Sequence, residues 1–191
     1  MNNVTKRCFI VALALGLFAF TTGSALAAKK VKTEDELIAQ LGSAKEKEVI
    51  SALQQMEKLY PASTSCQAAI KPLLADSRKP VARKAARVLG IMNAPVSDAD
   101  LKNIATLLKS ADKAEIIDGL KALRGLKAQS LIPEITPLLQ NPNKNVVRDA
   151  CRTLAVLGDK SLIPTLKPLL EVSDLAVQKD AADAIAILRE K

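Results

Sequence analysis

The stretch Ser130–Lys160 reads SLIPEITPLLQNPNKNVVRDACRTLAVLGDK, and it decides the fold because the chain repeats its design at once. Residues 161–191 read SLIPTLKPLLEVSDLAVQKDAADAIAILREK, a second copy that is also 31 residues long. Moving this template toward the N-terminus aligns further copies at spacings of 31, 34 and 33 residues. Self-similarity at such a period is typical of a solenoid. The sequence therefore predicts five repeats, at about 33–61, 62–94, 99–129, 130–160 and 161–191.

Each repeat has the pattern of two helices joined by a turn. In the second half of the template, apolar residues recur at the spacing of an amphipathic helix: Val146, Val147, Ala150, Cys151, Leu154 and Leu157. The first half predicts a shorter helix with Ser130 as its N-cap, and Asn141-Pro142-Asn143 supplies the turn. Pro72, Pro137 and Pro168 recur inside the first helices, where proline should kink them. We therefore expect an all-α chain.

Comparison of the copies shows which positions the architecture restricts. One column of the second helix is small in every copy: Ala52, Ala85, Gly119, Ala150 and Ala181. Another column is always large and apolar: Met56, Leu89, Leu123, Leu154 and Ile185. We expect both columns to be buried, the first where neighbouring helices approach closely and the second in the core.

A family resemblance is carried by residues of the fourth repeat and the start of the fifth: Val147-Arg148, Ala150, Leu154, Gly158-Asp159, Leu162, Leu166 and Leu169-Leu170. They resemble the HEAT repeat, in the short form known as the phycobilisome-lyase HEAT-like repeat. Residues 81–90 (VARKAARVLG) are similar, whereas in repeats one and three Glu48 and Glu115 occupy the position of Val146. The resemblance implies a right-handed α-solenoid, a superhelix of five HEAT-like helix pairs whose second helices line the concave side.

The N-terminus reads as a secretory signal peptide. Lys6 and Arg7 precede an apolar run over residues 8–20, and residues 25–27 (ALA) give a small-x-small cleavage pattern. An uncleaved membrane anchor is the alternative, but a span needs about 20 apolar residues. We therefore expect a signal peptide at 1–27, a mature domain at 28–191 with no stable membrane span, and a periplasmic or secreted location. Loss of residues 1–27 would lower the net charge from +8 to +6.

Histidine is absent from the whole sequence. This removes the commonest general base and metal ligand, and every Ser-His or Cys-His arrangement. It also bears on deoxyhypusine hydroxylase, which is built from HEAT-like repeats and binds iron through His-Glu pairs, because that activity is not carried over to this chain. We expect no enzymatic activity, no metal and no cofactor. An accessory factor or enzyme of the bilin-lyase type is the alternative that this repeat class leaves open.

Two cysteines follow the predicted cleavage site. Cys151 shares a column with Leu53, Ala86, Leu120 and Ala182, which predicts a buried small hydrophobe. Cys66 follows Ser63, Thr64 and Ser65 at a predicted helix start, where amide groups can lower a thiol pKa. It is therefore a candidate redox or intermolecular disulfide site, although a plain structural thiol is the simpler interpretation.

A basic row runs along the polar side of the second helices. Its members come from two adjacent columns of repeats two to four: Arg83, Arg87, Lys121, Arg148 and Arg152. We call these five residues the basic ladder. One hypothesis is that the ladder binds an acidic protein segment or an anionic polymer of the cell envelope, and the simpler alternative is an ordinary solvated face. Nucleic acid is a poor candidate, because Tyr60 is the only aromatic residue after the predicted signal peptide.

These observations together predict a non-catalytic protein-binding or scaffold module of the cell envelope. The partner is expected to be a protein, with acidic character if the ladder binds it. The fifth repeat ends with an apolar stripe on its second helix. Either its own first helix covers that stripe, or the end face is left for another subunit, so a homo-oligomer stays open.

Overall fold

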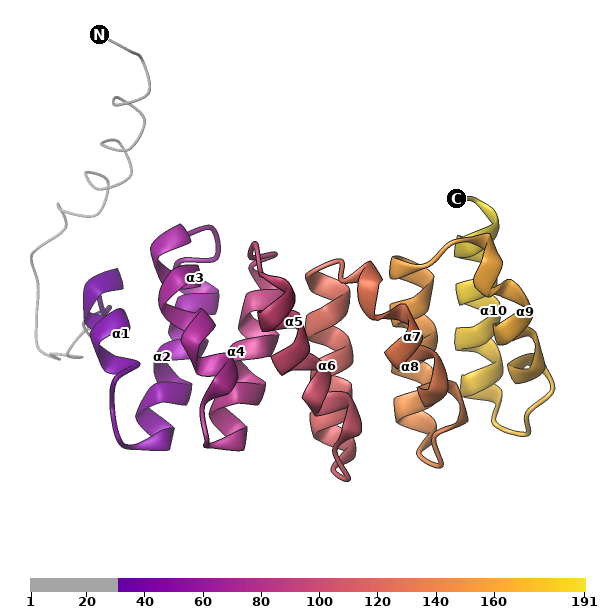
Figure 1. The fold of residues 1–191 in the computed structure, drawn as a ribbon, viewed down its shortest axis with the longest axis horizontal. Coiled ribbons are helices and arrows are strands. Elements are labelled where there is room, and N and C mark those ends of the chain that lie inside the picture. The colour runs from indigo at the N-terminus through magenta and orange to yellow at the C-terminus, as the bar shows by residue number, and fades with distance from the viewer. Residues whose placement is uncertain (1–30) are drawn as a thin grey trace, which may run out of the picture. The chain divides into compact units, whose positions relative to one another are not determined.

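Helix pairs follow one another along the chain from Glu34 to Arg189 (Figure 1). The computed structural model describes residues 31–191, and every regular element in that range is a helix. The predicted signal peptide, residues 1–27, and its cleavage site lie outside the described residues. The predicted all-α solenoid of five helix pairs is confirmed.

The first helices of the pairs are short and the second helices are longer. The first helices are α1 (Glu34–Gln40), α3 (Thr64–Ile70), α5 (Asp98–Thr106), α7 (Ile132–Ile135) and α9 (Ile163–Leu166). The second helices are α2 (Glu46–Leu59), α4 (Lys79–Ile91), α6 (Lys113–Gly125), α8 (Lys144–Leu157) and α10 (Leu175–Arg189). Second helices of successive repeats pack directly against one another, from α2 to α10. They form one layer and the first helices form the other.

The recurring prolines change the hydrogen-bonding pattern of the first helices. After α3, α7 and α9 the chain tightens into 3-10 segments, each with a proline in its first turn: Lys71–Ala75, Thr136–Gln140 and Lys167–Leu170. Proline has no amide hydrogen for the i→i−4 bond, so the α-helix ends there and the tighter helix continues. The expected kink is thus a change of helix type. In repeat three Leu107–Lys109 makes the same change without proline.

The predicted N-cap at Ser130 is wrong. Ser130 lies within the 3-10 segment Gln129–Leu131, and α7 begins after Leu131 without a side-chain cap. Asn143 instead caps the second helix of this repeat, where its Oδ1 accepts from the amide of Asn145 at 3.1 Å. Asp112 and Asp174 cap α6 and α10 in the same way. In repeats three to five the polar residue that ends the turn therefore fixes the start of the long helix behind it, whereas α2 and α4 begin without a side-chain cap.

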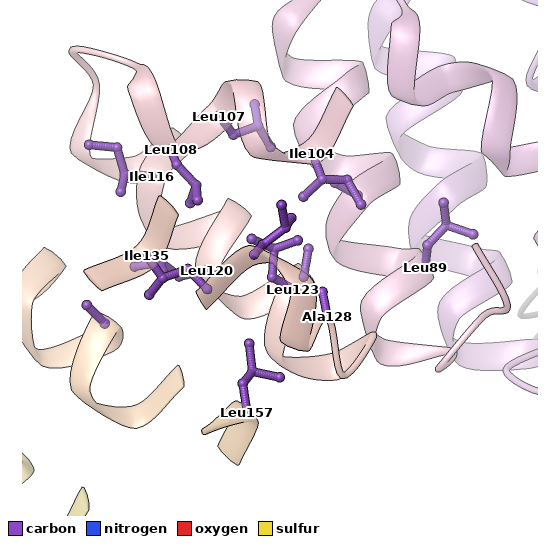
Figure 2. Close-up of a cluster of buried hydrophobic side chains, with 14 of the residues drawn as sticks. Leu89, Ile104, Leu107, Leu108, Ile116, Leu120, Leu123, Ala128, Ile135 and Leu157 are labelled. Carbon is purple, nitrogen blue, oxygen red and sulfur yellow. The ribbon is translucent and has the colours of Figure 1, made fainter. Parts of the chain in front are cut away.

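The apolar columns form a continuous core. All members of the small column and of the large column are buried, as predicted. Figure 2 shows the part of this core around repeat three, where Leu123 and Leu120 of α6 lie among side chains of the neighbouring elements. Each repeat covers the apolar side of the next, because an isolated helix pair leaves one side without a partner.

Glycines allow α4 and α6 to approach at backbone distance. A methyl group added to Gly125 would lie 2.2 Å from the carbonyl oxygen of Gly90, and one added to Gly90 would lie 2.8 Å from Cα of Ala122. Both are far inside van der Waals contact, and the atoms they would meet belong to the backbone. The two glycines therefore set the spacing between repeats two and three.

The same two helices end in the same motif. After α4 and α6 the chain turns through Asn93 and Lys127, which have positive φ values of 47° and 54°. The next amides, those of Ala94 and Ala128, each donate to a carbonyl five residues back at 3.1 Å. This is the Schellman arrangement, whose left-handed position most often carries glycine.

None of the helices between residues 31 and 191 has the length and the apolar character that a membrane span requires.

Candidate partner-binding surface

The residues of the basic ladder lie on the second-helix layer. Arg83 and Arg87 belong to α4, Lys121 to α6, and Arg148 and Arg152 to α8. The four arginine side chains are about a third to a half exposed. The structure thus places the ladder on one layer, as the columns predict, and it also shows what the arginines contact.

Arg148 and Arg152 hold one carboxylate of the following repeat. Nε of Arg148 donates to Oδ2 of Asp180 at 2.6 Å, while Nε and Nη2 of Arg152 donate to Oδ1 at 3.1 and 3.0 Å. The side chain of Asp180 is only 8% exposed. Burial opposes ionisation of this carboxyl, but the two guanidinium groups outweigh burial and hold its pKa below the ordinary value. We call these three residues the fourth-repeat clamp.

The second repeat has an equivalent clamp. Nε of Arg83 and Nη1 of Arg87 each lie 3.2 Å from an oxygen of Asp118 on α6. Arg83 also lies 3.8 Å from Asp112, the N-cap of that helix. Two of the four junctions between second helices are therefore joined in the same way, by two arginines four residues apart and one aspartate of the next repeat.

The other two junctions pair the column of Asp118 and Asp180 with a further column, and the charges are reversed between the two junctions. Glu57 accepts from Lys84 at 2.7 Å between α2 and α4, and Arg124 lies 3.8 Å from Asp149 between α6 and α8. Glu57 and Arg124 occupy one column, and Lys84 and Asp149 another. The ladder prediction missed Arg124 and all of these carboxylates. The signal was available, because Asp118, Asp149 and Asp180 recur at 31-residue intervals.

Lys121 differs from the ladder arginines. It makes no hydrogen bond or ion pair with any other residue in the described part of the chain. Each clamp combines two arginines with one aspartate, so part of the ladder's charge is neutralised within the molecule. The five ladder residues together with Asp118 and Asp180 keep a net positive charge, which includes the whole of the Lys121 ammonium group.

A hollow of about 800 Å³ lies at the turn edge between repeats two and three. It contains Glu115, which accepts from the hydroxyl of Ser110 at 2.6 Å. Glu48 accepts from Ser43 in the same way at 2.6 Å and lines a similar hollow in repeat one. The two glutamates that interrupt the valine column are therefore held by turn serines, which explains how repeats one and three tolerate them.

Both cysteines are buried thiols. Burial raises the pKa of Cys151 to about 12, in agreement with the expected core residue. For Cys66, burial raises the pKa and outweighs both the hydrogen bond with Ser63 and any lowering by the helix start. Burial and a raised pKa favour the plain structural thiol over the redox site, since the reactive form is the thiolate. Across residues 31–191, no three Cys, Asp or Glu side chains are grouped so that they would hold a metal ion.

Comparison with protein families finds a match for part of the repeats. The sequence pattern of HEAT repeats matches residues 102–186, from α5 into α10. This match covers less than half of the chain, and it identifies HEAT repeats in that part. A comparison of the chain with curated protein sequences finds no significant match.

Solved structures share the fold of the HEAT repeats at low sequence identity. One is the complex of CpcE and CpcF of phycocyanin lyase from Nostoc sp. PCC7120, with 20% identity, a TM-score of 0.71, and coverage of 91% of this chain and 71% of that chain. A designed armadillo repeat protein in complex with the peptide (KR)4 has 17% identity, a TM-score of 0.65 and 80% coverage of both chains. An engineered protein has 21% identity, a TM-score of 0.63, and coverage of 81% and 78%.

Proposed function

We propose that this chain is a non-catalytic scaffold of the cell envelope that holds a protein partner on its second-helix layer. The observation that carries the proposal is the solenoid itself, whose second helices present one uninterrupted surface over five repeats. Two of the similar structures are complexes, one between CpcE and CpcF and one with a peptide. The absence of histidine from the sequence supports a role without catalysis.

The charge of the surface favours an acidic partner. Lys121 is unpaired, and each clamp has two guanidinium groups for one carboxylate. A protein segment suits this surface better than a long anionic polymer, because four of the five ladder residues already hold aspartates. Charge of this kind mainly steers association and makes it dependent on salt.

Crosslinking in intact cells, followed by mass spectrometry of the captured polypeptides, tests the proposal. Lys121→Glu is the informative variant, since it reverses a charge on the surface without breaking a clamp. Lys102→Glu is the matched control, because Lys102 is an exposed and unpaired lysine on the first-helix layer. We expect Lys121→Glu to reduce capture and Lys102→Glu to leave it unchanged. Equal capture by all three proteins would contradict a partner on the second-helix layer.

Export is a separate part of the proposal. It rests on the apolar run over residues 8–20 and the cleavage pattern at 25–27. Fractionation of cells that express the full chain, with N-terminal sequencing of the purified protein, tests it. We expect a mature N-terminus at Ala28 in the periplasmic or secreted fraction. A cytosolic protein that keeps residues 1–27 would contradict it.

A second candidate function is that of an accessory factor or enzyme of the bilin-lyase type. The observation that favours it is the similarity to the CpcE and CpcF complex, which covers 91% of this chain. At 20% identity this similarity establishes only the fold. Absorbance separates the two candidates, because protein purified from its native host with a visible chromophore supports the lyase type. Colourless protein with a co-purifying polypeptide supports the scaffold.

A further inference from the structure

A groove of about 380 Å³ opens on the second-helix layer between α8 and α10. Ala155 and Ala184 line it and are themselves buried. Val156 and Ile187 also line it, yet they are 45% and 47% exposed. These two occupy one column, 31 residues apart. The groove therefore combines small buried residues with two large apolar side chains that are open to solvent.

The repeat columns explain why the groove lies at this junction. Ala155 occupies the column of Glu57 and Arg124, whose long side chains reach across the first and third junctions to form ion pairs. At the second junction the same column has Gly90, whose backbone packs directly against α6. Alanine is too small to fill the space and too large to allow backbone contact. The space between α8 and α10 is therefore left open.

Each carboxylate around the groove has a basic partner, although Asp183 is 56% exposed, and the two arginines that line the groove keep donor groups available. Asp180 is held in the fourth-repeat clamp, and Asp183 accepts from Lys179 at 2.6 Å. Arg124 also lines the groove, and its nearest carboxylate oxygen is 3.8 Å away, which is too long for a hydrogen bond. Arg152 uses Nε and Nη2 on Asp180, which leaves Nη1 without a partner.

We infer that this groove binds a short acidic segment of a protein partner that carries one large apolar residue. The apolar side chain lies against Val156 and Ile187, and a neighbouring carboxylate contacts Arg124 and Arg152. Apolar burial supplies affinity at the centre, and the two guanidinium groups select for negative charge at the rim. The inference rests on the proposed scaffold function and adds to it a location and a partner chemistry.

Short peptides test this chemistry directly on the intact chain. The probe is acetyl-Glu-Glu-Leu-Glu-Glu-amide, and the comparison peptides replace its leucine with glycine or its glutamates with lysine. Binding is followed by NMR of the valine and isoleucine methyl groups. We expect the leucine peptide to shift the methyl signals of Val156 and Ile187 and to leave those of Ile91 unchanged. Loss of the leucine side chain should lower affinity about tenfold.

Matched variants separate the groove from the general surface. Ile187→Asp should lower affinity about tenfold by removing the apolar contact. Ile91→Asp is the control, because Ile91 occupies the same column and is 51% exposed but lies outside the groove. Arg124→Ala should weaken binding of the acidic peptide, and Lys113→Ala, at the other end of α6, should not. The inference is overturned by equal shifts at Ile91, by equal binding of the glycine or lysine peptide, or by no binding at millimolar peptide.

Failure of this inference can be told apart from failure of the scaffold function. If the leucine peptide does not bind while Lys121→Glu still reduces capture in cells, the groove assignment is wrong and the scaffold proposal stands. If wild-type protein captures no polypeptide in cells, the scaffold proposal fails whatever the peptides do.

Discussion

Nε of Arg148 donates to Oδ2 of Asp180 at 2.6 Å and so joins the fourth repeat to the fifth. The acceptor is nearly buried and also receives two hydrogen bonds from Arg152. An arginine that looks like part of a solvated face along its own helix is thus a structural contact between helices. The predictions below follow from contacts of this kind.

Removing the carboxylate of the fourth-repeat clamp should destabilise the protein. Asp180→Ala leaves two guanidinium groups without their shared acceptor, and hydrogen bonds to charged groups contribute about 1.5 to 3 kcal/mol. We expect the free energy of unfolding to fall by about 2 kcal/mol in urea denaturation. Asp183→Ala is the control, because Asp183 is exposed and pairs with Lys179 on its own helix, so its loss should cost less than about 0.5 kcal/mol. Equal losses in the free energy of unfolding would show that the Asp180 carboxylate stabilises the protein no more than an exposed ion pair does.

The clamp should also make stability depend on pH in acid. The pKa of Asp180 is lowered in the folded state, whereas an aspartate in the unfolded chain has a pKa of about 3.9. The unfolded chain therefore binds this proton first, and the stability from the clamp is full above about pH 4 and is lost as pH falls through the lower, folded-state pKa. Urea unfolding of wild type and Asp180→Asn at several pH values measures this. We expect a shallower acid dependence in the variant, and parallel curves would contradict the assignment.

A methyl group between α4 and α6 should not be tolerated. Gly125→Ala would place Cβ 2.2 Å from the carbonyl oxygen of Gly90, so the two helices must move apart at a cost of about 1 to 3 kcal/mol. Gly42→Ala is the control, since its new methyl group would meet only the Ala39 carbonyl oxygen at 3.5 Å. Thermal unfolding should show a clear decrease in Tm for Gly125→Ala and little change for Gly42→Ala. A stabilised Gly125→Ala protein would mean that helix propensity outweighs the close approach.

Lys127 offers a stabilising change. Its φ of 54° places a lysine in the left-handed region, which costs a residue with a side chain about 1 kcal/mol relative to glycine. We expect Lys127→Gly to raise the free energy of unfolding by a few tenths to about 1 kcal/mol. Part of the relief of strain is offset, because glycine has more conformational freedom to lose from the unfolded chain. Lys58→Gly, inside α2, should be destabilising by about 1 kcal/mol. Differential scanning calorimetry of the two variants gives opposite shifts in Tm if the conformation is as described.

The sequence by itself determined the number of repeats, the pairing of their helices and the membership of the core. These follow from local periodicity, because burial of apolar side chains is the largest favourable contribution and repeats at intervals that can be read along the chain. The small column from Ala52 to Ala181 and the large column from Met56 to Ile185 are buried for this reason. The proline positions likewise indicated where the first helices change, although not that they become 3-10 helices.

Only the tertiary structure decided the use of the polar residues. Whether Arg148 faces solvent or Asp180 depends on the offset between two helices, and the spacing of residues along one helix does not give that offset. The same holds for Glu115, which is tolerated in an apolar column because a turn serine lies within hydrogen-bond reach. The groove between α8 and α10 exists because Ala155 lies opposite Ala184, and that juxtaposition arises only when the two helices pack.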